Sequence, residues 1–254
     1  LPFGKGTQTV SLDEAHVLYD LHGNPVDAVA DEQEAIRQAL RHPIGSAPLK
    51  DVVQAGDTVA IIVSDITRLV HTAQMLPVIV DELNQAGVRD EQITVVTAQG
   101  THRAHRPEED VIVCGEDMVK RVKVVSHDCR DASQLTKIGT TTHGNDVYLD
   151  SHVVQADKVI LTGAVSFHPM AGFGGGRKAV LPGVASYETI MRNHAMALTD
   201  TFGGGCNPRC ETSLLEDNPL HDDMKQAAAL LNPCFLVNTV FSADGDLYEV
   251  VGGH

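Results

Sequence analysis

The segment Thr58-Val-Ala-Ile-Ile-Val63 indicates the fold class, because it is a short run of apolar, mostly β-branched residues, and an amphipathic pattern over about residues 71–86 follows it. The first pattern predicts a buried strand, and the second predicts a helix that ends at Gly87. The run Ile93–Ala98 predicts another strand, and a second helix begins at Pro107, where proline suits the first helical turn. Strands and helices that alternate in this way are typical of βαβ units.

The same alternation continues along the chain. Residues 122–126 and 158–162 predict two further strands, and Asp31, Ser186 and Asn218 stand where the caps of three further helices are expected. We therefore expect an α/β fold with a mostly parallel, Rossmann-like sheet flanked by helices.

Composition and charge exclude several classes of protein. The 254 residues include 19 Lys and Arg against 34 Asp and Glu, a formal net charge of −15, which repels polyanions and argues against nucleic acid as a partner. The apolar runs are far shorter than the roughly 20 residues of a membrane span. The five cysteines form no C-x-x-C pair, which favours a reducing, cytoplasmic location.

Polar side chains collect in the loops that follow three of the predicted strands. Ligands of open parallel sheets bind beyond the carboxyl ends of the strands, so these loops are expected to converge on one site. The loops are Ser64-Asp-Ile-Thr-Arg68, Gly100-Thr-His-Arg103 and the glycine-rich segment from Ser166-Phe-His168 to Lys178.

The stretch Gly172-Phe-Gly-Gly-Gly-Arg-Lys178 is the most unusual of the three, with four glycines in five residues. Glycines let the backbone approach a ligand and present amides to an anion such as phosphate, although a flexible loop with a solvated Arg-Lys pair has the same pattern. The stretch is no P-loop, because Ala179 follows the lysine where Ser or Thr would bind magnesium. It also matches G-x-G-x-x-[GA], but without the acidic residue of a dinucleotide site.

Several side chains of these loops can carry chemistry. Lys178, beside apolar neighbours, is either a solvated lysine or a nucleophile and covalent anchor with a lowered pKa. His102 and His168 are surface histidines or an acid/base pair. Asp65 and Arg68 form a clamp for a carboxylate or phosphate, with a helix cap as the alternative for Asp65.

Two further histidines leave other possibilities open. His194, on a predicted helix, is either a core histidine or a metal ligand. His102-x-x-His105 has the spacing of a metal pair, although Arg103 and Arg106 beside it disfavour a cation.

In combination, the ordered motifs resemble the lactate racemase family, the nickel-dependent 2-hydroxy-acid racemases and epimerases. The resemblance covers nearly the whole chain and implies that residues 1–254 form an N-terminal, cofactor-binding α/β domain whose C-terminal partner domain lies outside this chain. The segments that carry it are Leu1-Pro-Phe-Gly-Lys5, Pro43-Ile-Gly-Ser46, Ser64-Asp-Ile-Thr-Arg68, Gly100-Thr-His-Arg103, Ser166-Phe-His168, Gly172-Phe-Gly-Gly-Gly-Arg-Lys-Ala-Val-Leu-Pro-Gly183, Ala185-Ser-Tyr-Glu-Thr-Ile-Met191 and Asn193-His194.

The resemblance implies a nickel-pincer nucleotide, nickel pyridinium-3,5-bisthiocarboxylic acid mononucleotide, bound covalently to Lys178 through a thioamide. His194 would be the one protein ligand of the nickel, in a planar site that suits Ni(II). The amides of Gly174, Gly175 and Gly176, with Asp65 nearby, would hold the phosphate and ribose.

For the reaction, the resemblance implies that Arg68 binds the substrate carboxylate and that His102 and His168 are the acid/base pair. The α-hydrogen of a 2-hydroxy acid is not acidic, so it would leave as hydride, transiently accepted by the cofactor. Thr101 replaces a bulkier aromatic residue of the lactate enzyme, which leaves lactate, malate and aldonates open as substrates.

Two other functions remain as alternatives. A zinc-dependent hydrolase would use His102, His105 and His168, and a non-catalytic binding module would hold a phosphorylated ligand through the glycine loop and Arg68. The expected partners of the racemase are a small 2-hydroxy acid and the proteins that make the cofactor.

Overall fold

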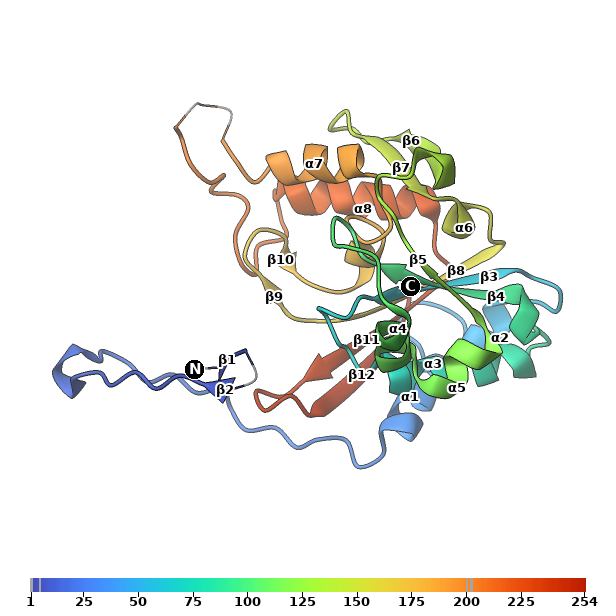
Figure 1. Ribbon diagram of the computed structural model, residues 1–254, viewed down its shortest axis with the longest axis horizontal. Helices are drawn as coiled ribbons and strands as arrows, with labels where there is room; N and C mark the ends of the chain where they lie inside the picture. Colours follow the sequence, from blue (N-terminus) through green and yellow to red (C-terminus); the bar gives the residue numbers. More distant parts are fainter. Residues whose placement is uncertain (1, 5, 200, 202) are drawn as a thin grey trace.

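The computed structural model describes residues 2–4, 6–199, 201 and 203–254. Its centre is a six-stranded sheet with the strand order β12-β11-β8-β3-β4-β5 (Figure 1). The strands β11, β8, β3, β4 and β5 run parallel, and β12 pairs antiparallel with β11 at the edge. The predicted mostly parallel α/β sheet is thereby confirmed. Its strands are β3 (Val59–Ser64), β4 (Ile93–Ala98), β5 (Lys123–Ser126), β8 (Lys158–Ala164), β11 (Phe235–Phe241) and β12 (Leu247–Gly253).

The predicted helices form, and their caps are those expected from the sequence. Asp31 accepts a hydrogen bond from the backbone N–H of Glu34, Ser186 from that of Thr189, and Asn218 from that of His221. The helices are α1 (Glu32–Arg41), α2 (Leu49–Val52), α3 (Thr72–Gln85), α4 (Pro107–Cys114), α5 (Glu116–Arg121), α6 (Ser151–Val154), α7 (Tyr187–Ala195) and α8 (Pro219–Leu231), with 3-10 turns η1 (Glu14–His16), η2 (Asp90–Gln92), η3 (Ala132–Gln134) and η4 (Gly176–Ala179). No helix of this described part is long and apolar enough to cross a membrane.

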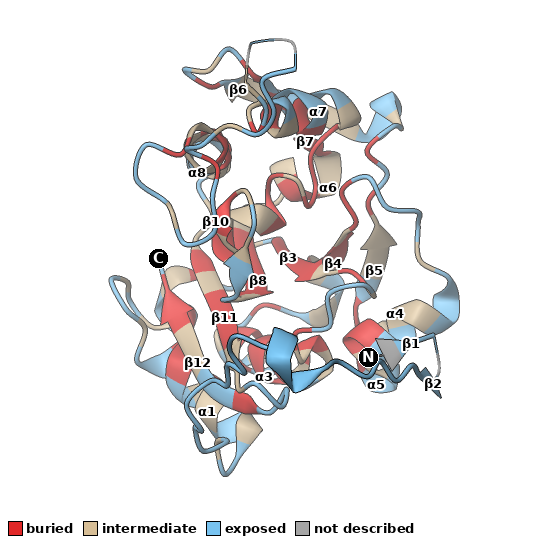
Figure 2. Cartoon of the chain, turned by 90° about the vertical axis from the view of Figure 1, so that its left-hand side faces the viewer, coloured by how far each residue is buried: buried red, intermediate tan, exposed pale blue. Residues whose placement is uncertain are grey.

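Helices cover both faces of the sheet, so the molecule has two hydrophobic cores (Figure 1). Successive side chains of a strand point to opposite faces, and Ile61 accordingly packs with α1 and α3 while Ile62 packs with α7 and α8. Figure 2 shows many of the buried residues in the inner strands of the sheet, such as β3, β8 and β11. This double burial explains why the inner strands β3, β4 and β8 are largely apolar runs without polar alternation.

Several short elements were not predicted. The strands β6 (Leu135–Thr140) and β7 (Asp146–Asp150) form a hairpin that packs beside α6 and α8. Inside the glycine-rich segment, β9 (Phe167–His168) pairs with β10 (Gly172–Phe173), and β1 (Pro2–Phe3) pairs with β2 (Gly6–Thr7). Pairs this short depend on tertiary contacts, which a sequence pattern does not record.

The order of the strands places the site. From β3 the chain builds outward to β4 and β5 on one side, and then returns to add β8 and β11 on the other side of β3. The direction of building therefore reverses between β3 and β8. Open α/β sheets bind their ligands in the crevice at such a reversal, beyond the carboxyl ends of the strands.

Candidate active site

A cavity of about 280 Å³ lies at this crevice, formed by the loops after β3, β4 and β8 together with residues of η4 and α7. The structure brings nearly all of the predicted site residues together around it. The lining includes Asp65, Arg68, His102, His168, Gly174, Gly175, Lys178 and His194. Gly176, the remaining predicted residue, does not line the cavity. It is buried and directly precedes Arg177 and Lys178 in the chain.

The side chain of His102 is held by Asp65. The Nδ1 atom of His102 lies 2.6 Å from the Oδ2 atom of Asp65, and Asp65 is buried while the imidazole is half-exposed. The two residues follow neighbouring strands, since Ser64 of β3 pairs with Ala98 of β4. The other carboxylate oxygen of Asp65 accepts hydrogen bonds from the backbone N–H and the hydroxyl of Thr67.

His168 stands in a different environment, on the hairpin of β9 and β10. Its Nδ1 accepts hydrogen bonds from the backbone N–H groups of Met170 and Ala171, at 3.3 and 3.0 Å. The proton of the neutral ring is therefore on Nε2, the nitrogen that remains available to a ligand. Burial, followed by the charges of Lys178 and Arg68, lowers the pKa of His168 to about 4.

This lowered pKa predicts that His168 of the apoprotein stays neutral at pH values where an ordinary histidine, with a pKa of about 6.5, is half protonated. Because the folded state binds this proton less readily than the unfolded state, the free energy of unfolding falls as the pH drops from about 6.5 towards 4. An NMR titration of the His168 ring checks the prediction. A midpoint near 6.5 for this ring would contradict it.

The cavity is cationic, although the protein as a whole is acidic. Asp65 is the only acidic side chain among the described residues that line it, and it is engaged by His102. Burial, followed by Arg177 and Arg68, lowers the pKa of Lys178 to about 8. Burial also lowers the pKa of Arg177 to about 10, while its Nη2 donates to the carbonyls of Ala171 and Phe173. Such a set of cations favours an anionic ligand.

The glycine segment is folded back on the sheet, and this uses part of its hydrogen-bonding capacity. The amide of Gly174 donates to the carbonyl of Ser166 at 2.7 Å, and the amide of Gly176 donates to Oδ1 of Asn238 at 3.2 Å. Gly175 has φ +74°, and a Cβ at this position would lie 2.8 Å from the Asn238 oxygen and 2.9 Å from the Ala164 carbonyl. In this arrangement, the glycines permit close packing of the turn that carries Lys178, and the amides of Gly174 and Gly176 are already bonded within the protein.

His194 lies on α7, and its orientation is fixed from within the helix. Its Nδ1 faces the carbonyl of Ile190 at 3.1 Å and must donate to it, which leaves the lone pair of the neutral ring on Nε2. Burial, followed by the charge of Lys178, lowers its pKa. The neighbouring Asn193 anchors α7 to α8, because its amide donates to Leu220 and to the fully buried carboxylate of Asp223.

Two buried amides near the site were missed by the sequence reasoning. Asn238 interrupts the apolar run of β11 and supports the glycine turn, and this polar interruption was the signal that could have identified it. Gln99, which is 1% exposed, lines the cavity, and its Oε1 is a buried atom without a hydrogen-bond partner in the described structure. Gln99 directly precedes the Gly100-Thr-His-Arg103 motif, but no spacing rule distinguishes it from a surface residue.

His105, the third histidine of the zinc alternative, is not available as a ligand. Its Nδ1 bonds Asp110 at 2.9 Å, its Nε2 accepts from the backbone N–H of Ile66 at 2.9 Å, and its side chain is 1% exposed. In the described ranges, no group of three or more His, Cys, Asp or Glu side chains is arranged to hold a metal ion. The bonds of His105 argue against the zinc-dependent hydrolase.

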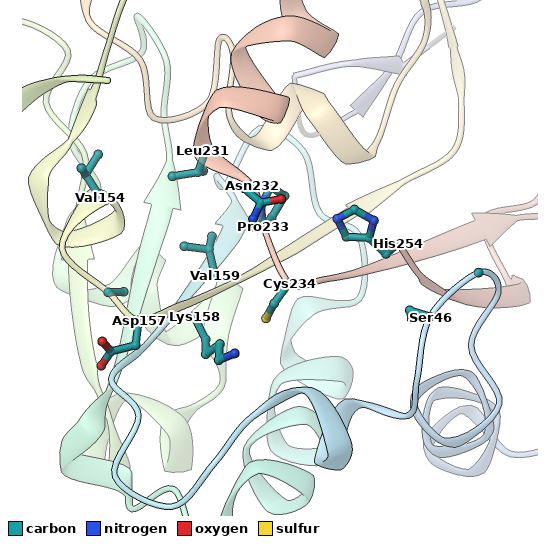
Figure 3. A pocket seen from close by; sticks show the side chains of 12 residues that line it. Ser46, Val154, Asp157, Lys158, Val159, Leu231, Asn232, Pro233, Cys234 and His254 are labelled. Carbon is teal, nitrogen blue, oxygen red and sulfur yellow. The ribbon is translucent and has the colours of Figure 1, made fainter. Parts of the chain in front are cut away.

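A second cavity, of about 400 Å³, lies near the amino ends of β8 and β11 (Figure 3). Asp157 in its lining already accepts two hydrogen bonds, from the N–H and the hydroxyl of Thr58. Burial raises the pKa of the Cys234 thiol, which disfavours a reactive thiolate. His168, Lys178 and His194, whose pKa values are lowered by burial, come together in the cavity at the carboxyl edge, which is therefore the candidate active site.

The chain is similar to known proteins over most of its length. The family model of the lactate racemase N-terminal domain matches residues 3–203. The chain belongs to the lactate racemase family. The lactate racemase of Thermoanaerobacterium thermosaccharolyticum is 31% identical over 256 residues, covering 100% of this chain and 58% of the relative. That of Lactiplantibacillus plantarum is 34% identical over 250 residues, covering 96% and 56%.

Solved structures support the same fold. The lactate racemase apoprotein from Thermoanaerobacterium thermosaccharolyticum superposes with a TM-score of 0.82 at 31% identity, covering 93% of this chain and 56% of that chain. A protein from Thermotoga maritima, at 21% identity and a TM-score of 0.68, shares the fold. The chain thus spans a little more than half the length of the lactate racemases that it matches.

Proposed function

We propose that this protein racemises or epimerises a small 2-hydroxy acid, with His102 and His168 as the acid/base groups. The observation that carries the proposal is the convergence of these histidines with Arg68, Lys178 and His194 on one cavity. Membership of the lactate racemase family supports the reaction class.

A tethered nickel-pincer nucleotide fits the residues of the cavity. His194 offers Nε2 while its Nδ1–H is bonded to a backbone carbonyl, the arrangement usual for metal-ligating histidines. The lowered pKa of Lys178 makes its amine a better nucleophile for a covalent bond to the cofactor. The surrounding cations suit a phosphate, and Gly175 and Gln99 line the same space.

The two histidines divide the proton transfers. When bound, the cofactor supplies a hydride acceptor for the α-hydrogen, and the hydroxyl proton is left to the protein. His102, with its lone pair on Nε2, accepts that proton from one enantiomer. For the other enantiomer His168 is the base, and it accepts the proton at Nε2 after its own ring proton has moved to Nδ1, with release of the backbone donors of Met170 and Ala171. Arg68 binds the carboxylate, for which its guanidinium is suited.

The substrate and the setting are parts of the same proposal. Lactate is the first candidate because the relatives are lactate racemases, and malate and aldonates are the next. We further propose that residues 1–254 act as the cofactor-binding part of the enzyme and that cofactor-making proteins load Lys178. The five free cysteines suit a cytoplasmic location.

The test is racemisation by protein co-expressed with the cofactor-making enzymes. The substrates are single enantiomers of lactate and malate that carry deuterium at C2. The products are separated by chiral chromatography, and mass spectrometry measures their deuterium content. We expect both enantiomers to form and the deuterium to remain on carbon, because a hydride does not exchange with water. Protein that carries nickel and the adduct on Lys178 but leaves every 2-hydroxy acid unchanged would refute the proposal.

A further inference from the structure

The environment of Asp65 is that of a positioning residue. Asp65 follows β3 directly and is 3% exposed, and both of its carboxylate oxygens have partners within the protein. Oδ1 accepts the hydroxyl of Thr67 at 2.7 Å and its backbone N–H at 3.2 Å. Oδ2 lies 2.6 Å from Nδ1 of His102. The resemblance placed Asp65 beside the ribose and phosphate of the cofactor, but in this geometry the carboxylate is directed at a histidine.

The contact with Asp65 determines which nitrogen of His102 carries the proton. An ionised carboxylate can only accept, so Nδ1 must donate, and the lone pair of the neutral ring is then on Nε2. The loop of His102 is fixed as well, because its backbone N–H donates to the carbonyl of Gln99 at 2.8 Å. His168 has backbone donors at Nδ1 and therefore the opposite tautomer.

We propose that Asp65 is a positioning residue that acts through His102, holding the imidazole with its lone pair on Nε2 so that it can accept the hydroxyl proton of the substrate. The inference rests on the proposed function for its catalytic consequence. The tautomer itself is a property of the apoprotein, and it can be measured whether or not the proposed reaction occurs.

The variant Asp65→Asn is informative because Thr67 determines how the new amide is oriented. The two donors of Thr67 retain the side-chain oxygen at the Oδ1 position, so the NH₂ group takes the place of Oδ2 and faces His102. An NH₂ group donates, which makes Nδ1 the acceptor and transfers the proton of the ring to Nε2. The base would then have its lone pair on the wrong nitrogen.

The experiment compares the wild-type protein with Asp65→Asn, Asp65→Glu and Asp222→Asn. Asp222 also bonds a histidine, His143, at 2.9 Å, but it lies on α8 outside the cavity lining and serves as the matched control. ¹⁵N NMR of the apoproteins reports the tautomer of His102. Chiral assays and intact mass of the loaded proteins report kcat, KM and the adduct on Lys178.

We expect Nδ1–H at His102 in the wild-type protein, in Asp65→Glu and in Asp222→Asn, and Nε2–H in Asp65→Asn. The kcat of Asp65→Asn should fall by about 10²- to 10⁴-fold with little change in KM and with the adduct retained. An unchanged tautomer in Asp65→Asn, or Nε2–H in Asp65→Glu, would overturn the positioning role. Loss of the adduct in Asp65→Asn with the tautomer preserved would instead assign Asp65 to the cofactor.

These results also separate the two proposals. Wild-type protein that shows Nδ1–H at His102 and carries the adduct, yet does not racemise any 2-hydroxy acid, contradicts the proposed function and leaves the positioning of His102 intact. Racemisation by the wild-type protein with an unaltered kcat in a folded Asp65→Asn variant contradicts the positioning role alone.

Discussion

Lys178→Ala is expected to abolish both the covalent adduct and racemisation. Lys178 is the only lysine among the described residues that line the cavity, and burial with two neighbouring arginines lowers its pKa to about 8. Its amine is therefore the nucleophile best placed to attach a cofactor. Intact mass and metal analysis of protein co-expressed with the cofactor-making enzymes measure the first loss, and a chiral assay measures the second.

Two further variants make this result specific. Lys158→Ala removes a lysine at the opposite end of β8, in the cavity of Figure 3, and should retain the adduct. Lys178→Arg retains a positive charge but not an amine that acylates readily, and should lose the adduct as Lys178→Ala does. An unmodified Lys178 in active, nickel-containing wild-type protein would show that the cofactor is held in another way.

His102→Ala and His168→Ala are expected to give the second large effect, a fall in kcat of about 10²- to 10⁴-fold for each variant. Each removes one proton-transfer group from the cavity, and neither residue is proposed to bind the nickel or the covalent arm. The adduct on Lys178 should therefore be retained. Chiral assays measure turnover in both directions, and intact mass confirms that the variants are loaded.

The control for these variants is His143→Ala, which removes a histidine that is bonded to Asp222 and lies away from the cavity. Its turnover should match that of the wild-type protein. If either active-site variant, folded and loaded, racemised the substrate at the wild-type rate, the division of proton transfers between two histidines would be wrong.

Four of the six strands of the central sheet, β3, β4, β5 and β8, were predicted from the sequence, and β3, β4 and β8 form apolar runs because they are buried on both faces. β3 was predicted at residues 58–63 and forms at Val59–Ser64, and β4 was predicted with its observed bounds. The hairpin of β6 and β7 was not predicted, because its strands are only partly buried and contain the polar residues Lys137 and Asp146. Its stability depends on contacts with α8, which is distant in the sequence.

The membership of the site was predictable, but its internal bonding was not. Loops after parallel strands meet at one edge, and this rule brought His102, His168 and Lys178 to a common cavity. No spacing rule indicated that Asp65 would bond His102, or that Asn238 would accept from the glycine turn. Such hydrogen bonds depend on side-chain rotamers and on neighbours that the fold supplies from distant segments.

If Lys178 carries the cofactor as proposed, its charge links cofactor attachment to the proton affinity of the neighbouring histidines. After the larger effect of burial, the ammonium of Lys178 contributes to the low pKa values of both His168 and His194. A thioamide nitrogen carries no such charge, so this contribution disappears when the lysine is acylated. Acylation of the Lys178 amine and protonation of the His168 ring are thus thermodynamically linked. Apoprotein and loaded protein should accordingly have different titration curves for His168, even where the backbone is the same in both.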